Sequence, residues 1–215
     1  MASVWICGEE NSEHCYVVDG NIIIGGINQG KNDEYTKEFI NKIEVEKPYS
    51  VLFRVQRNEV IGFFEKEKKV KPNCKSEVEK FLKNFREIKV SLGGKYVNEI
   101  YQVYARHIAQ HYYEKYKINL DNNTVDILIN EEYHLRSDIF LISNALEFAD
   151  VKNIKEIKIV SLDPKIVPRP GKDEYKDVAD EILKTYPRIK LMTPKTALEE
   201  LTNPKNMFSA VNLIS

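Results

Sequence analysis

The sequence predicts a mixed α/β fold, formed as a single domain by residues 1–215. Hydrophobic residues make up 42% of the chain and charged residues 30%, which is typical of a globular protein. The first half contains short apolar runs separated by turn residues, and from Asn123 onward strand-like and helix-like segments alternate. Such alternation favours parallel strands joined by crossover helices. A chain of this length can bury a core that needs neither disulfides nor a structural metal.

Three apolar runs near the N-terminus predict the first strands. Residues 3–7 form a short β-type run that stops at a polar cluster, and residues 15–18 and 21–27 flank the pair Asp19-Gly20. An Asp-Gly pair between two apolar runs is a strong signal for a hairpin turn. We therefore expect an antiparallel N-terminal meander of three strands.

The middle of the chain predicts helices and a second hairpin. Apolar residues recur at helical spacing over residues 33–45, and residues 50–55 and 59–64 flank a polar turn, as in a hairpin. A helix over residues 76–88 begins at Ser76, which can cap it, and a longer tyrosine-rich helix follows over residues 96–116. These helices connect the two halves of the chain.

The second half predicts three units of strand and helix. The expected strands are residues 124–132, 154–164 and 188–194, and the expected helices are residues 137–151, 173–186 and 196–203. Because a helix follows each strand, the strands are expected to lie parallel in the sheet.

The charge and cysteine content limit the partners and the compartment. The net charge is −1, from 32 basic and 33 acidic side chains, so no global field attracts nucleic acid or an anionic membrane. Nucleic-acid binding would need a local patch, and a protein partner or a homo-oligomer is also compatible with the composition. The three cysteines lack CxxC spacing, and the chain shows neither a signal peptide nor an apolar run of about 20 residues. We therefore expect a cytoplasmic protein without a membrane span.

Acidic side chains follow three of the predicted strands; they are Glu9, Glu10, Glu131, Glu132 and Asp163. The carboxyl ends of strands border the ligand crevice of open α/β sheets, so these acids are expected to converge. Clustered carboxylates raise one another's pKa, and a hard cation such as Mg²⁺ or Mn²⁺ relieves their repulsion. Glu9, Glu131 and Asp163 are the predicted metal ligands, and bound ions would support phosphodiester hydrolysis. The plain alternative is that the acids cap the helices that follow them.

The N-terminal motifs resemble those of a known family. The opening strand ends in residues 8–12 (GEENS), and the run IIIGGI follows. This is similar to the start of a family of small ribonuclease H-fold proteins, in which a strand ends in Asp-Glu-Ser-Gly and a second one in Gly-Gly-Val. The resemblance implies a ribonuclease H-like fold and metal-dependent nuclease activity, with Glu9 or Glu10 as the first catalytic acid. The second would be Glu131 or Glu132.

Two further residues are candidates for substrate contacts. Arg106 lies in the tyrosine-rich helix, where cations beside aromatic rings can contact phosphates, and His134 follows the Glu pair as a candidate for proton transfer. The sequence does not decide whether the chain is an enzyme. One alternative is a non-catalytic interaction or assembly module of the same fold. Another is a PIN-like or Rossmann-like domain, which would order the strands differently.

Overall fold

The computed structural model describes residues 1–27, 34–66, 73–132 and 135–203, with the backbone alone for Glu132. Within these ranges six strands form one sheet in the order β4-β1-β3-β2-β5-β6. The strands are β1 (Ala2–Cys7), β2 (His14–Val18), β3 (Ser50–Phe53), β4 (Arg86–Val90), β5 (Glu156–Val160) and β6 (Ile189–Met192). Strands β2, β3, β5 and β6 run parallel, whereas β1 runs antiparallel to both of its neighbours, β3 and β4. The expected mixed α/β architecture is confirmed.

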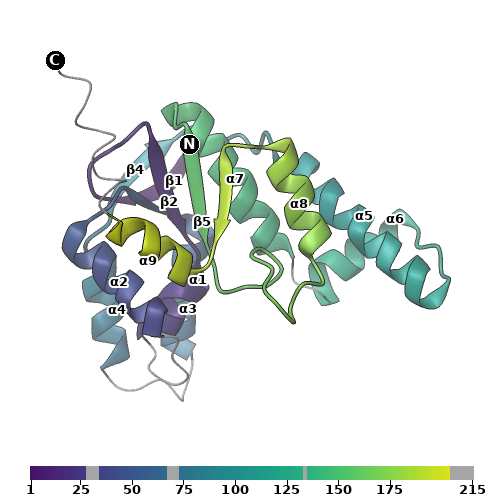
Figure 1. The fold of residues 1–215 in the computed structure, drawn as a ribbon, viewed down its shortest axis with the longest axis horizontal. Coiled ribbons are helices and arrows are strands. Elements are labelled where there is room, and N and C mark those ends of the chain that lie inside the picture. The colour runs from purple at the N-terminus through teal and green to yellow at the C-terminus, as the bar shows by residue number, and fades with distance from the viewer. Residues whose placement is uncertain (28–33, 67–72, 133–134, 204–215) are drawn as a thin grey trace.

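Helices cover both faces of the sheet (Figure 1). One face carries α1 (Gly20–Ile27), α2 (Glu34–Glu46), α3 (Arg54–Lys66), α4 (Cys74–Leu82) and α9 (Pro194–Thr202). The other face carries α5 (Val97–Tyr116), α6 (Asn122–Ile127), the π-helical turn η1 (Leu128–Glu132), α7 (Arg136–Lys152) and α8 (Lys176–Thr185).

Alternating side chains of the central strands build a separate core on each face. In β2, Cys15 and Val17 belong to the core under α5, α7 and α8, while Tyr16 and Val18 belong to the core under α1, α2 and α9. The whole run is buried because both faces are covered, as in parallel sheets generally. The period of two therefore distributes an unbroken apolar run between two cores.

The prediction of an N-terminal meander is wrong. Residues 21–27 form most of α1 rather than a strand, and β2 pairs with β3 and β5 in parallel instead of forming a hairpin. Ile22, Ile23 and Ile27 are buried against the sheet, so tertiary packing overrides the preference of isoleucine for strands. The pair Asp19-Gly20 does not turn a hairpin, because Asp19 directly follows β2 and Gly20 begins the helix.

Two other predicted strands are also helical. Residues 59–64 lie in α3, where Gln56, Val60 and Phe64 are buried at intervals of four residues. Residues 124–132 form α6 and η1, and Asp121 caps α6 by accepting a hydrogen bond from the Thr124 N–H at 2.7 Å. The helix predicted over residues 76–88 ends earlier, since residues 86–90 pair with β1 as strand β4.

The remaining alternation of the second half is confirmed. The strands predicted around residues 154–164 and 188–194 contain β5 and β6, which pair in parallel. The helices predicted to follow each of the three segments correspond to α7, α8 and α9, and the tyrosine-rich helix corresponds to α5.

A glycine at the end of β1 offers a test of the backbone there. Gly8 has a φ of +79°, and a Cβ atom on it would lie 2.1 Å from the Lys47 carbonyl oxygen. Gly8→Ala is expected to lower the free energy of unfolding by more than about 1 kcal/mol, because alanine is strained at positive φ. The matched control is Gly62→Ala in α3, where nothing lies within 4 Å of the added Cβ and alanine should stabilise the helix by about 0.5–1 kcal/mol. Urea denaturation measures both changes, and equal stabilities would contradict this account.

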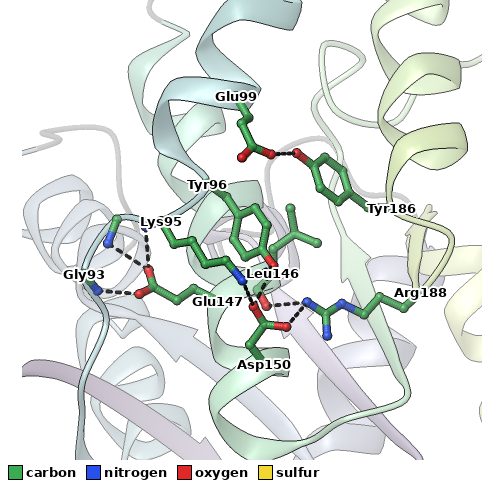
Figure 2. A network of polar contacts seen from close by, with 10 residues as sticks. Gly93, Lys95, Tyr96, Glu99, Leu146, Glu147, Asp150, Tyr186 and Arg188 are labelled. Atoms are coloured by element: carbon green, nitrogen blue, oxygen red, sulfur yellow. Dashed lines mark hydrogen bonds and ion pairs between the residues drawn. The ribbon is translucent and has the colours of Figure 1, made fainter.

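A polar network positions α7 against the loop that leads into α5 (Figure 2). Glu147 of α7 is only 7% exposed, and its carboxylate accepts hydrogen bonds from the backbone N–H groups of Gly93, Gly94 and Lys95. These three donors satisfy a buried charge that would otherwise be costly. The contact attaches α7 to the start of α5.

Asp150, one turn further along α7, extends the network to β6. It accepts hydrogen bonds from the Tyr96 hydroxyl at 2.6 Å and Lys95 Nζ at 2.9 Å, and it also pairs with Arg188 (Figure 2). Burial opposes ionisation of Asp150, but these hydrogen bonds hold its pKa well below the usual range. The last turn of α7 is therefore tied to α5 and to the sheet, which orients the whole helix.

Candidate functional site

Polar side chains lie at the carboxyl ends of two adjacent parallel strands, at the same edge of the sheet. Asp19 follows β2 and is only 6% exposed, and Ser161 follows β5. The Ser161 hydroxyl donates to Asp19 Oδ2 at 2.6 Å, and Asn21 Nδ2 donates to the same oxygen at 2.7 Å. Asn21 is itself fixed, because its Oδ1 accepts from the Leu162 N–H at 3.0 Å. The ends of β2 and β5 are thus joined by a small hydrogen-bond network.

This edge coincides with the switch point of the sheet. The chain leaves β2 through α1 on one face and reaches β3, whereas it leaves β5 toward α8 on the other face and reaches β6. Connections that diverge from neighbouring parallel strands leave a crevice outside their carboxyl ends, where ligands of open α/β sheets usually bind. Asp19 and Ser161 lie at this point.

Three more carboxyl groups face the same edge. Asp163 follows β5, and its Oδ1 accepts from the Lys165 N–H at 2.9 Å. Glu59 reaches from α3, so that a Cβ atom on Gly20 would lie 3.0 Å from Glu59 Oε2. Asp138 comes from the first turn of α7, is 7% exposed, and its Oδ2 has no hydrogen-bond partner among the described residues. We call Asp19, Glu59, Asp138 and Asp163 the acidic cluster.

Burial and repulsion between carboxylates raise the pKa values of three members of this cluster. Burial raises the pKa of Asp19 to about 7, although the Ser161 hydrogen bond opposes the shift and Glu59 adds to it. Burial raises the pKa of Asp138 to about 8, and repulsion from Asp163 and Asp19 adds to that shift. Partial burial and the charge of Asp163 also raise the pKa of Glu59. The four groups therefore influence one another although they come from four elements.

The donor set is suited to a hard cation. All its atoms are carboxylate, amide and hydroxyl oxygens, which Mg²⁺ and Mn²⁺ prefer. Across the described ranges, no three His, Cys, Asp or Glu side chains are arranged as a ready-made metal site. Mg²⁺ commonly keeps several water ligands and uses one or two carboxylates together with substrate phosphate, so a complete protein cage is not required. The unpartnered Asp138 oxygen is the strongest sign that a ligand completes this edge.

The structure does not bring the predicted acids Glu9, Glu10 and Glu131 together. Glu10 accepts a hydrogen bond from Lys152 at the C-terminal end of α7, whereas Glu131 precedes the N-terminal end of the same helix. The 17 residues of α7 span roughly 25 Å, at 1.5 Å per residue. Glu9 and Glu10 follow β1, which runs antiparallel to β3 and β4, so they lie at the opposite edge of the sheet from Asp19.

The other predicted residues have different outcomes. Asp163 is the one predicted ligand that the structure places in the acidic cluster. Arg106 forms an ion pair with Glu181, which joins α5 to α8 on the surface. His134 and the side chain of Glu132 lie outside the described residues.

The sequence interpretation missed Asp19, Glu59 and Asp138. Asp19 directly follows the buried run of β2, so the strand-end rule that selected Asp163 also applies to it. It was overlooked because an Asp-Gly pair between apolar runs indicates a hairpin. Glu59 and Asp138 lie on helices, where a single acid carries no local signal that distinguishes it from a solvated residue.

Comparison with protein-family models, with curated proteins and with solved structures finds no match. Among the described residues, no helix combines the length and apolarity needed to cross a bilayer.

Proposed function

We propose that the chain is a divalent-metal-dependent phosphodiester hydrolase whose site is the acidic cluster. The observation that carries this proposal is the buried, unpartnered Oδ2 of Asp138 beside three other acids at the switch point of the sheet. An isolated buried carboxylate is costly unless it is protonated or bound by a cation. A bound Mg²⁺ or Mn²⁺ would neutralise these acids, and the remaining coordination positions would be open to phosphate oxygens.

Each member of the cluster has a role consistent with its surroundings. Asp19 is held rigidly by Ser161 and Asn21, which suits a ligand that must keep its orientation. When bound, the metal would lower the pKa of a water ligand and offset the charge of the phosphate. Glu59, the more exposed acid with a raised pKa, is suited to accept a proton from the attacking water.

The connections between the strands favour a PIN-like or Rossmann-like arrangement over the ribonuclease H-like one. A ribonuclease H-like sheet was expected to begin with an antiparallel meander. Here β2 and β3 are parallel neighbours joined through α1 and α2, and β5 continues the parallel set on the other side of β2. This arrangement supports acids at the ends of β2 and β5 as the centre of the site.

A non-catalytic module is the competing function. It is favoured by the lack of a preformed metal-binding group within the described ranges. In that case the cluster takes no ion.

The deciding experiment combines metal binding with cleavage. We expect purified protein to bind Mn²⁺ in calorimetry and to cleave a fluorescent single-stranded oligonucleotide or bis(p-nitrophenyl) phosphate only when Mg²⁺ or Mn²⁺ is present. The double variant Glu9→Gln with Glu10→Gln should retain that activity, because these acids lie at the opposite edge of the sheet from Asp19. Absence of both ion binding and cleavage would support the non-catalytic module instead. Loss of activity in the double variant would move the site back to the acids selected from the sequence.

A further inference from the structure

A hollow lies beside the acidic cluster, on the side of α8. It is lined by residues 164–165 and 171–175 and has a volume of about 380 Å³. This volume is at the lower end of the range of small-molecule sites, roughly 300–1,000 Å³. The lining begins directly after Asp163, whose carboxylate accepts a hydrogen bond from the backbone of Lys165. The residues that line the hollow therefore directly follow a member of the cluster in the sequence.

Tyr175 connects the two regions in space as well. Its side chain is 5% exposed and lines the hollow, and its ring packs on His107 with centroids 4.6 Å apart. Burial raises the pKa of Tyr175, and the charges of Glu174, Asp138 and Asp163 add to the shift. Two of these three acids belong to the cluster, so a ligand in the hollow would lie close to the proposed metal.

The loop that carries Lys172 is held in a defined shape. The Lys172 N–H donates to the Arg169 carbonyl oxygen at 2.8 Å, and the Arg169 N–H donates to the Lys172 carbonyl oxygen at 3.1 Å. Gly171 has a φ of +76°, which permits this tight turn, and the Arg169 guanidinium donates to the Leu162 carbonyl oxygen at 2.6 Å. The turn is thereby tied to the end of β5, and it holds Lys172 at the hollow.

The charges around the hollow suit an anion held next to the reacting phosphate. Lys165 and Lys172 line it, and α8 begins at Lys176 immediately after it, so the positive end of the helix dipole faces the same region. Asp173 and Glu174 also border the hollow and oppose this attraction. Because two lysines and two acids border the hollow, we expect it to bind a phosphate group with modest affinity rather than tightly.

We propose that the hollow binds the phosphate adjacent to the scissile one in a substrate with several phosphodiester bonds, and that Lys172 is its main side-chain contact. This inference rests on the proposed function, because it assigns the hollow as a subsite of that reaction. It identifies the preferred substrate as a polymer of phosphodiesters rather than an isolated phosphate ester. Lys172 acts here as a specificity residue and takes no part in bond cleavage.

The test compares Lys172→Gln with Lys176→Gln on two substrates. Lys176 is the matched control, since it is an exposed lysine four residues away that does not line the hollow. Lys172→Gln is expected to lower kcat/KM for a single-stranded oligonucleotide about tenfold, the typical effect of one charged hydrogen bond. The affinity of Lys172→Gln for the oligonucleotide should also depend less on salt. The slope of log affinity against log salt concentration should become less steep by about 0.7, the value for one phosphate contact on a single strand. Cleavage of bis(p-nitrophenyl) phosphate, which has one phosphate, should not change, and Lys176→Gln should match the wild type on both substrates.

A reverse variant and a binding measurement separate the outcomes. Glu174→Gln removes an opposing charge, so it should raise oligonucleotide affinity. Equal losses on both substrates, or equal effects of Lys172→Gln and Lys176→Gln, would overturn the subsite. If the wild type cleaves neither substrate, the proposed function fails, and fluorescence anisotropy with the same oligonucleotide then decides whether Lys172 binds phosphate at all. Unchanged anisotropy in Lys172→Gln would overturn the inference independently.

Discussion

Asp19→Asn is expected to reduce metal-dependent phosphodiester cleavage by about 10²–10³-fold, the usual cost of removing one preorganised electrostatic group. Asp19 is the most rigidly held acid of the cluster, because both Ser161 and Asn21 donate to its Oδ2. Asparagine keeps the size of the side chain but carries no charge for a cation. The measurement is the initial rate of oligonucleotide cleavage at fixed Mn²⁺, together with the Mn²⁺ affinity from calorimetry.

The control for Asp19→Asn is the same change at Asp180, which is exposed on α8 away from the cluster. Asp180→Asn should leave the rate unchanged. Thermal unfolding followed by circular dichroism separates lost chemistry from lost folding, and Asp19→Asn should unfold no earlier than the wild type at pH 8 because it removes a buried charge. Wild-type cleavage by a folded Asp19→Asn protein would exclude Asp19 as a metal ligand.

The metal-free protein is expected to lose stability as the pH rises from about 4 to 8. Asp19 and Asp138 have folded-state pKa values of about 7 and about 8, whereas the unfolded chain releases these protons near pH 3.8. Between those limits the folded protein binds more protons than the unfolded chain, so stability is full below about pH 4 and falls through the folded pKa values. Each group can contribute at most about 1.4 kcal/mol per pH unit over its interval.

Two measurements isolate this effect from other titrations. In urea denaturation without metal, Asp138→Asn should stabilise the protein at pH 8 but not at pH 4, because asparagine never acquires the buried charge. Mn²⁺ should raise the melting temperature of the wild type more at pH 8 than at pH 5, since the ion competes with protons for the same oxygens. A free Mn²⁺ concentration of 100 times its Kd would raise the free energy of unfolding by about 2.7 kcal/mol. Identical pH profiles for the wild type and Asp138→Asn would contradict the raised pKa of Asp138.

Local patterns predicted the helices with one regular apolar face and the short apolar strands that lie between helices. In α8, Val178, Ala179 and Ile182 recur at helical spacing between polar residues, and that helix was expected from the sequence. In β5 and β6 short apolar runs lie between helices, and both strands were expected. The patterns failed where a helix is rich in residues typical of strands, as in α1 with its three consecutive isoleucines.

The sequence selected only one member of the acidic cluster that the structure assembles. The rule that acids at strand ends meet at one edge of the sheet selected Asp163, which lies in the acidic cluster, but it also selected Glu9 and Glu10, because the direction of β1 was unknown. Antiparallel pairing places the end of β1 at the opposite edge. A strand's direction in the sheet depends on its partners, and a short apolar run contains no information about them.

By itself the sequence determined a globular α/β chain, the last two parallel strand-helix units of its second half, and an acid at the end of β5. Local sequence patterns suffice for these elements. Buried residues recur every second position in a strand and every third or fourth position in a helix. Only the tertiary structure decided that Asp19 and Asp163 meet Glu59 and Asp138, since these four side chains come from elements up to 144 positions apart in the chain. Their proximity results from the packing of α3 against α1 and α7 and of α7 against β5, and no local pattern encodes such long-range packing.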